Sequence, residues 1–306
     1  MKKIAMVGLG RMGGNMARRL RLGGAEVVAH NRSFAVTQQL AAETGLLAVE
    51  TLQQLVESLG DGPRIIWLML PAGEATQQAL DTLVPMLGAG DIVVDGANAF
   101  YKDSQRRAGE LGAWGIQFVD VGVSGGVWGL QNGYAMMAGG EPAAVKQLEF
   151  YLKILAPAPD KGWLHCGPAG SGHFVKMIHN GIEYGMMQAF AEGFALMKGK
   201  QEFDLDLGAI SEMWRHGSVV RSWLLDLSAD FLRQDQDLSA IAPFVSDSGE
   251  GRWTAFEAIE QGVPAPVMSL ALMMRFASQG SNDFPARMLA MMRKGFGGHA
   301  IKEGAK

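Results

Sequence analysis

The stretch IAMVGLGRMGG, residues 4–14, decides the fold expected for the first half of the chain. A short β-rich apolar run ends at Gly8, and Gly8, Gly10 and Gly13 then form the pattern G-x-G-x-x-G before a helical stretch. The first glycine permits a tight turn, the second lets a pyrophosphate approach the backbone, and the third lets the helix pack closely on the strand. The pattern predicts a dinucleotide-binding turn, although a tight turn without a ligand can carry the same glycines.

The end of the second expected strand bears on the choice of dinucleotide. An acidic residue there would bind the ribose 2'-hydroxyl of NAD, but the sequence reads Asn31, Arg32 and Ser33. Asn31 and Ser33 can donate hydrogen bonds to a 2'-phosphate, and Arg32 can neutralise it or stack on the adenine. NADP is favoured and NAD is possible; the alternative is an exposed turn with a solvated arginine. The candidate cofactor-binding residues are Gly8, Leu9, Gly10, Arg11, Met12, Gly13, Asn31, Arg32, Ser33 and Asn98.

The first half alternates short β-rich runs with helical patterns. This alternation predicts an α/β N-terminal domain of the Rossmann type, with a mainly parallel, doubly wound sheet. We expect strands at 4–10, 26–31, 64–71, 91–98, 116–122 and 134–140, and helices near 14–22, 34–44, 75–87 and 102–113.

The second half loses the strand signal and becomes rich in Met, Ala and Leu, which predicts an all-α C-terminal domain. We expect helical segments at roughly 170–199, 207–229, 249–260, 265–278 and 283–295. The glycines of 167–172 indicate the boundary. The predicted domains are a dinucleotide-binding domain, 1–166, and a helical substrate and dimerisation domain, 167–306.

Composition narrows the class of protein. The chain has 306 residues, of which 48% are hydrophobic and 19% charged, enough for two domains with their own cores. A net charge of -4 and the lack of a long basic run argue against nucleic acid as a partner. No apolar run is long enough to cross a membrane, and the single cysteine, Cys166, favours a reducing cytoplasm. No Cys and His set has metal-ligand spacing, so no metal is expected.

Two further loops follow expected strands, DGAN at 95–98 and VSGG at 123–126. In an open α/β sheet such loops lie at the carboxyl edge, where ligands bind. Asn98 and Ser124 offer neutral hydrogen bonds, and Gly125 with Gly126 exposes backbone amides. Tight turns alone would explain each loop separately, but not three polar loops at one edge.

The stretch KMIHNGIEYG, 176–185, places five polar side chains on one face of an expected helix. These are Lys176, His179, Asn180, Glu183 and Tyr184, spaced i, i+3, i+4, i+7 and i+8. Lys176 and Glu183 would lie about 10 Å apart along the axis, a span comparable to a six-carbon ligand. A lysine acting as a general base must be neutral, which burial favours. The alternative is a buried polar network that braces helices.

Several long stretches together resemble the 6-phosphogluconate dehydrogenases, in particular their short bacterial branch, and more broadly the β-hydroxyacid dehydrogenases. The stretches are GLGRMGGNMARRL, VSGGVWGLQNGY, residues 165–194, RHGSVVRSWLLDL, residues 246–267 and FGGH. The resemblance implies oxidative decarboxylation of 6-phosphogluconate to ribulose 5-phosphate, in the pentose phosphate pathway or gluconate use. It also implies a homodimer, or a homotetramer, in which the C-terminal segment of one subunit completes the site of the next.

The resemblance also implies roles for individual residues. Lys176 would be the general base and later acid, and Glu183 the general acid that protonates C1 of the enediol. The residues implied to hold the substrate are Asn98, Ser124, Gly125, Gly126, His179, Asn180 and Tyr184, with Arg275 on the phosphate and Arg293 and His299 from the neighbouring subunit.

Some positions depart from the family pattern. The usual DGGNS has Ala97 and Ala99 here, GTSGG has Val123, and the phosphate-binding lysine and threonine of the long enzymes fall at Ser248 and Glu250. These changes leave open another sugar acid, for example one with a C6 sulfonate, or a small β-hydroxyacid. A further alternative is an inactive dinucleotide-binding regulator, although such a protein would not need Lys176, Asn180 and Glu183.

Overall fold

The computed structural model describes residues 2–280, 283–297, 300 and 302. The chain divides into two compact units, residues 1–178 and 179–306, and the division falls within the long helix α8 (Ser171–Gly199). The boundary expected between residues 166 and 167 lies just before this helix and stays a prediction.

The first unit is built on one sheet, which has eight strands within the described residues and the order β3-β2-β1-β4-β5-β6-β7-β8. Neighbouring strands are parallel except for β6 and β7, which are antiparallel. The prediction of a mainly parallel sheet is confirmed. The strands are β1 (Lys3–Val7), β2 (Glu26–His30), β3 (Leu47–Ala48), β4 (Ile65–Leu68), β5 (Ile92–Asp95), β6 (Gln117–Ser124), β7 (Ala135–Gly140) and β8 (Trp163–Gly167).

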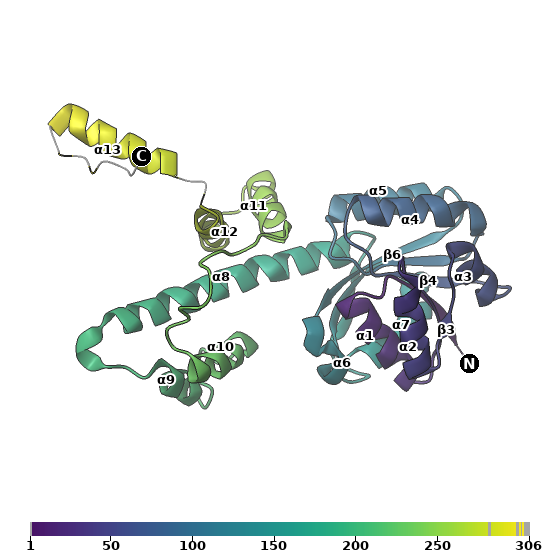
Figure 1. Cartoon of the computed structure of the whole chain (residues 1–306). Coiled ribbons are helices and arrows are strands. Elements are labelled where there is room, and N and C mark those ends of the chain that lie inside the picture. The colour runs from purple at the N-terminus through teal and green to yellow at the C-terminus, as the bar shows by residue number, and fades with distance from the viewer. Residues whose placement is uncertain (1, 281–282, 298–299, 301, 303–306) are drawn as a thin grey trace. The chain divides into compact units, whose positions relative to one another are not determined.

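Helices cover both faces of the sheet, as expected for a doubly wound fold (Figure 1). Side chains alternate across a strand, so Ile4 and Met6 of β1 join one core while Ala5 and Val7 join the other. The first core is closed by α1 (Arg11–Leu22), α2 (Phe34–Thr44) and α7 (Pro142–Leu155). The second is closed by α3 (Leu52–Leu59), α4 (Glu74–Leu83) and α5 (Tyr101–Gly112).

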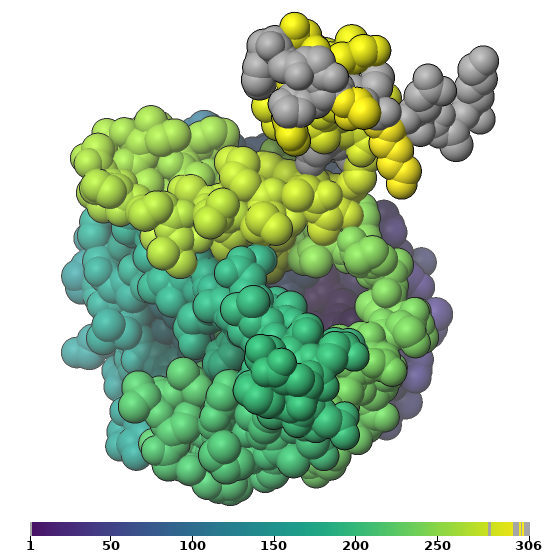
Figure 2. Space-filling model, turned by 90° about the vertical axis from the view of Figure 1, so that its left-hand side faces the viewer, coloured from purple at the N-terminus to yellow at the C-terminus, as the bar shows by residue number. Residues whose placement is uncertain are grey.

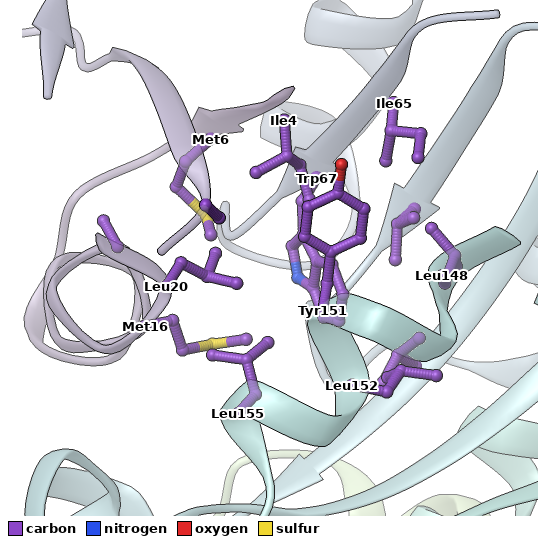
Figure 3. Packing of buried hydrophobic residues seen from close by; sticks show 14 of the residues in the cluster. Ile4, Met6, Met16, Leu20, Ile65, Trp67, Leu148, Tyr151, Leu152 and Leu155 are labelled. Atoms are coloured by element: carbon purple, nitrogen blue, oxygen red, sulfur yellow. The ribbon is translucent and has the colours of Figure 1, made fainter. Parts of the chain in front are cut away.

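The first core is tightly filled by large side chains (Figure 3). Trp67 lies among Met16 and Leu20 of α1 and Leu148 and Tyr151 of α7, and all five are at most 2% exposed. The Tyr151 hydroxyl donates to the Lys3 carbonyl oxygen at 2.8 Å, so its one polar group is satisfied. Each such side chain contributes about 1.5–3 kcal/mol by burial. This packing holds β1, and with it the turn that follows.

The second unit contains only helices and loops among its described residues, as predicted. The C-terminal part of α8 packs with α9 (Leu207–Trp214) and α10 (Trp223–Gln234) around Phe194, Leu225 and Leu232. Helices α11 (Glu250–Gln261) and α12 (Pro266–Ser278) form a second pair and lie side by side (Figures 1 and 2). The last helix is α13 (Asp283–Gly297).

Some elements differ from those expected. The single helical segment expected at 207–229 is wrong, because the backbone leaves the helix between α9 and α10. Gly217 adopts φ +85°, which ends the helical path, and the Ser222 hydroxyl accepts from the Leu225 amide at 3.1 Å to begin α10. The expected elements also omitted β3, α3, α7 and β8. Searched across the described residues, the helices include no candidate for spanning a membrane.

A buried ion pair joins β5 to α5 in the first unit. The Arg107 guanidinium donates to the Asp95 carboxylate at 2.9 Å, and the two side chains are 1% and 0% exposed. Burial raises the pKa of Asp95 to about 6, and Arg107 opposes this rise. Arg107 also donates to the Gly73 carbonyl at 3.2 Å and to Gln77 at 3.2 Å. It therefore ties the loop after β4 to the loop after β5.

We predict that Arg107→Met destabilises the fold by about 3–5 kcal/mol at neutral pH, because it leaves a buried carboxylate without its partner. The loss should grow as the pH rises. The pKa of Asp95 in the folded protein lies above its value in the unfolded chain, so the folded protein binds more protons at this carboxyl. The free energy of unfolding therefore falls as the pH rises between these two pKa values. Removing Arg107 raises this pKa further. Urea unfolding at pH 5 and pH 8 measures the change.

Arg106→Met is the matched control. Arg106 is the preceding residue but is about half exposed, and it pairs with Glu110 at 2.8 Å. Exposed pairs contribute about 0–1 kcal/mol, so this variant should unfold nearly like the parent protein. Equal effects of the two substitutions would contradict the importance of the buried pair.

Candidate active site

The glycine turn after β1 leaves room for a ligand at one position and none at the others. A Cβ on Gly8, where φ is +92°, would lie 2.4 Å from the Met69 carbonyl oxygen, and a Cβ on Gly13 would lie 2.1 Å from that of Gly8. A Cβ on Gly10 would meet nothing within 4 Å. Gly8 and Gly13 are thus required by packing, while Gly10 opens to space at the start of α1, where backbone amides can bind phosphate.

The neighbouring residues Leu9, Arg11 and Met12 lie in the same turn. Leu9 is buried, Met12 is partly buried against the first core, and Arg11 is exposed at the first position of α1. The first turn of α1 carries no acidic residue and no side-chain cap. The amides of this turn therefore face no competing negative charge, and the residues present fit a dinucleotide pyrophosphate.

The loop after β2 is tied to this turn by Asn31. The Asn31 carboxamide accepts from the Leu9 amide at 3.0 Å and donates to the Ser33 carbonyl at 3.3 Å. Its polar atoms thus shape the loop. Arg32 and Ser33 are exposed, and in the described part of the chain the Arg32 guanidinium makes no hydrogen bond or ion pair. Arg32 is therefore a positive charge at the end of β2 that a ligand can reach.

Asn98 joins the loops after β5 and β6. Its side-chain oxygen accepts from the Val123 amide at 3.1 Å, and its side-chain nitrogen donates to the Val123 carbonyl at 3.3 Å. Ala97, Ala99 and Val123, three of the departures from the family pattern, are each at most 6% exposed. These departures therefore change how the loops pack.

Ser124 ends β6 and is followed by two glycines in the left-handed region. Gly125 has φ +134° and Gly126 φ +52°, conformations that glycine adopts without strain. A Cβ on Gly126 would meet nothing within 4 Å. The turn thus presents backbone at the same edge of the sheet as Asn98.

Lys176 lies on α8 directly above Gly122 of β6. It is 5% exposed, and a Cβ on Gly122 would lie 2.3 Å from the Lys176 Cβ. Gly139 and Gly172 make similarly close approaches, since a Cβ on Gly172 would lie 2.3 Å from the Met137 carbonyl oxygen and one on Gly139 would lie 2.6 Å from the Gly172 nitrogen. The start of α8 therefore crosses β6 and β7 almost backbone to backbone, which brings Lys176 next to the loop at 123–126.

A buried carboxylate holds the first turn of α8. The Asp120 oxygens accept from the Gly170 amide at 2.6 Å and from the His173 amide at 2.7 Å. Negative charge at a helix N-terminus is favourable. Burial raises the pKa of Asp120 and lowers that of His173, whose Nδ1 lies 2.7 Å from the Ser104 hydroxyl. Asp120 and Ser104 thus fix α8 to β6 and α5.

The remaining residues of the predicted stripe follow Lys176 along α8. The His179 ring nitrogen Nδ1 lies 3.7 Å from the Glu183 carboxylate and 3.0 Å from the side-chain amide oxygen of Asn180. The side chains of His179 and Glu183 are 37% and 39% exposed, so both can reach a ligand. The helix is continuous from Ser171 to Gly199, and the spacing expected from the sequence applies to all five positions.

Tyr184 lies in a second polar cluster, wholly within the second unit. Its hydroxyl lies 3.1 Å from the Ser248 hydroxyl, which donates to Glu250 at 2.5 Å. The Arg275 guanidinium lies over the Tyr184 ring at 3.5 Å from the centroid and donates to the Ser246 carbonyl at 2.8 Å. The structure thus brings together Tyr184 and Arg275, two of the residues that the resemblance implied for the substrate.

Two residues of the C-terminal segment were assigned to the site of the neighbouring subunit. Arg293 lies on α13 and is exposed. His299 falls outside the described residues.

Sequence reasoning missed the positioning residues Asp120, His173, Ser104 and Arg107. Asp120 is a charged residue within the otherwise buried strand β6, and an unexplained charge in an apolar strand is the signal that could have found it. Across the ranges that the structure describes, no three His, Cys, Asp or Glu side chains are grouped as metal ligands would be.

Comparison with known proteins covers nearly the whole chain. Residues 3–166 match the model for the NAD binding domain of 6-phosphogluconate dehydrogenase, and residues 172–291 match the model for its C-terminal domain. A Haloferax volcanii protein named NAD+-dependent, decarboxylating 6-phosphogluconate dehydrogenase is 41% identical over 300 residues, which are 98% of each chain.

A Bacillus subtilis protein named NADP+-dependent 6-phosphogluconate dehydrogenase is 35% identical and is matched over 90% of this chain and 61% of its own length. Among solved structures, Plasmodium falciparum 6-phosphogluconate dehydrogenase, studied alone, with NADP+ and with 6-phosphogluconate, superposes with a TM-score of 0.83 at 27% identity. That match covers 99% of this chain and 67% of the other. With both halves of the chain matched, and a relative of the same length at 41% identity, this protein belongs to the 6-phosphogluconate dehydrogenase family.

Proposed function

We propose that this protein oxidises and decarboxylates 6-phosphogluconate to ribulose 5-phosphate and CO2, with reduction of NAD(P)+. The observation that carries the proposal is that Lys176 is buried and set over Gly122, beside the loops that carry Asn98 and Ser124. Family membership supplies the substrate, because the relatives named above act on it. The other sugar acids, the small β-hydroxyacids and an inactive regulator are not favoured by these relatives.

The residues of the chain divide the chemistry between them. Lys176 accepts the proton of the C3 hydroxyl, and a bound nicotinamide ring would accept the hydride from C3. The protonated Lys176 then lies beside the new C3 oxygen and stabilises the enolate charge that develops as CO2 leaves. Glu183, about 10 Å further along the same helix axis, protonates C1 of the enediol. Asn98, Ser124, Gly125, Gly126, His179 and Asn180 orient the sugar acid.

For the cofactor, we propose that NADP is preferred. Support comes from Arg32, which is exposed at the end of β2 with no acidic residue beside it, while Asn31 is engaged with Leu9 and Ser33. A guanidinium suits a 2'-phosphate. NAD remains compatible with the same turn, and the relatives carry names with either cofactor.

We also propose a homodimer, or a pair of dimers, in which the C-terminal segment of one subunit, with Arg293 and His299, completes the site of the other. Large apolar side chains on α12 and α13 support an interface, because Val267, Leu270, Phe284 and Leu289 are each more than half exposed. A cytoplasmic location and a role in pentose phosphate or gluconate metabolism belong to the same proposal, and the single cysteine suits a reducing compartment.

The direct test incubates the protein with 6-phosphogluconate and either NAD+ or NADP+, and follows both the absorbance of the reduced nicotinamide and trapped CO2. Both products should form in equal amounts. Reduced nicotinamide without CO2 would indicate a simple hydroxyacid dehydrogenase, and the absence of both with any sugar acid would favour the regulator.

Lys176→Met should lower kcat by about 10²–10⁴-fold, the range for loss of a general acid–base group, while cofactor affinity stays nearly unchanged. Lys198→Met is the matched control, since Lys198 lies on the same helix but is exposed and pairs with Asp237. Steady-state kinetics and cofactor titration by protein fluorescence separate the two effects. Turnover comparable to the parent would rule out Lys176 as the base.

Arg32→Ala should raise KM for NADP+ about 10-fold or more, because a charged hydrogen bond contributes about 1.5–3 kcal/mol, and should change KM for NAD+ much less. Arg106→Ala, at an exposed position of α5, controls for a general loss of positive charge. If KM rises equally for both cofactors, Arg32 does not recognise the 2'-phosphate.

Co-expression of the Lys176→Met and Arg293→Ala chains should restore activity that neither variant shows alone. If C-terminal segments are shared, a mixed dimer contains one site with both Lys176 and Arg293. Random pairing in a two-fold dimer would then give about a quarter of the parental activity. Differently tagged chains purified in tandem provide the mixed dimer for assay, and an inactive mixed dimer would show that Arg293 serves its own subunit.

A further inference from the structure

The polar cluster around Tyr184 has a defined hydrogen-bond direction. A serine hydroxyl has one hydrogen, and a carboxylate can only accept. Ser248 gives its hydrogen to Glu250 at 2.5 Å, so the Ser248 oxygen must accept from Tyr184 across the 3.1 Å contact. The Tyr184 hydrogen is therefore committed to Ser248, and a further partner meets only the lone pairs of the phenol oxygen.

The cluster is also electrically balanced. Arg275 contributes one positive charge and Glu250, which is 6% exposed, one negative charge. The nearby Arg252 is paired with Asp247. The five N–H groups of Arg275 include only two with protein partners in the described residues, the Ser246 carbonyl and the Met187 sulfur, so donors remain for an anion. The positive charge of Arg275 is thus matched, within the cluster, by a carboxylate charge of equal magnitude on Glu250.

We infer that Glu250, acting through Ser248, makes the Tyr184 hydroxyl a hydrogen-bond acceptor toward the C6 end of the sugar acid, and so lowers the preference for a C6 phosphate over a C6 hydroxyl. A phosphate dianion offers the phenol no hydrogen to accept, whereas a hydroxyl does. Glu250 is then a specificity-determining residue. This inference rests on the proposed function and on the family resemblance, which implies that Tyr184 holds the substrate and that Arg275 binds its phosphate.

Glu250→Gln tests the inference with little change in shape. The glutamine amide can donate to Ser248, which reverses the direction of both hydrogen bonds. Ser248 then donates to Tyr184, and the Tyr184 hydrogen becomes available to a ligand. We expect KM for 6-phosphogluconate to fall about 3- to 10-fold, the effect of about 1 kcal/mol for one hydrogen bond, and KM for gluconate to stay or rise. The measured quantity is the ratio of kcat/KM for 6-phosphogluconate to that for gluconate.

Loss of a negative charge alone could also favour phosphate, so two comparisons separate the causes. Glu257→Gln removes one carboxylate from the same helix at a position outside the cluster, and should leave the ratio unchanged. Tyr184→Phe in the Glu250→Gln background should abolish the gain, because only the phenol hydrogen supplies it. A double-mutant cycle with the Glu250→Gln and Tyr184→Phe substitutions, alone and combined, gives the coupling free energy between the two residues. A gain that survives in the double variant, or appears with Glu257→Gln, would overturn the inference.

Ser248→Ala provides an independent way to free the Tyr184 hydrogen, because it removes the hydroxyl that accepts that hydrogen. It should raise the ratio of kcat/KM for 6-phosphogluconate to that for gluconate, as Glu250→Gln should. If Glu250→Gln lowers the unfolding temperature, the Ser248→Ala variant serves as the test of the inference. An unchanged or lowered ratio with Ser248→Ala would contradict the inference. Activity of the parent protein on 6-phosphogluconate tests the proposed function separately, since it does not depend on the ratio.

Discussion

The hydrogen bonds between the Asp120 carboxylate and the first amides of α8 are the constraint on which the candidate site depends. A helix of 29 residues starts with backbone amides that lack helical partners, and here a carboxylate from the neighbouring strand β6 supplies two of those partners. Because Asp120 and Gly122 are two residues apart on β6, they face the same side of the sheet. Asp120 therefore fixes where the helix starts, and Gly122 leaves room for Lys176 further along the helix.

The site is supported from a second direction by Arg107. This residue bonds to Asp95, in the strand that leads to Asn98, and to the Gly73 carbonyl, in the loop that precedes α4. Loops at the carboxyl edge of an α/β sheet bind different parts of a ligand. The Arg107 guanidinium holds the loop after β4 against the end of β5, so the positions of these two parts of the sheet edge depend on each other.

Much of this arrangement could be predicted from the sequence, for physical reasons. The turn at Gly8, Gly10 and Gly13 has few backbone solutions, so its fold follows from its residues. The interval between Lys176 and Glu183 defines a common helical face once the helix is assumed. The break between α9 and α10 was not predicted, because it depends on Gly217 and Ser222 within a run that otherwise looks helical. For contacts made across the sequence, such as Asp120 with α8 and Tyr184 with Ser248, no local pattern identifies the partner.

The close approach of Gly122 to Lys176 also bears on how this scaffold can change. Any side chain at residue 122 would displace the helix that carries the proposed base, because a Cβ there would lie 2.3 Å from the Lys176 Cβ. Residue 123, one step further along β6, points to the opposite face and here carries valine. New specificities on this framework must therefore arise from the loop beyond the crossing or from the far end of α8, where a side chain can be exchanged while the proton-transfer group stays in place.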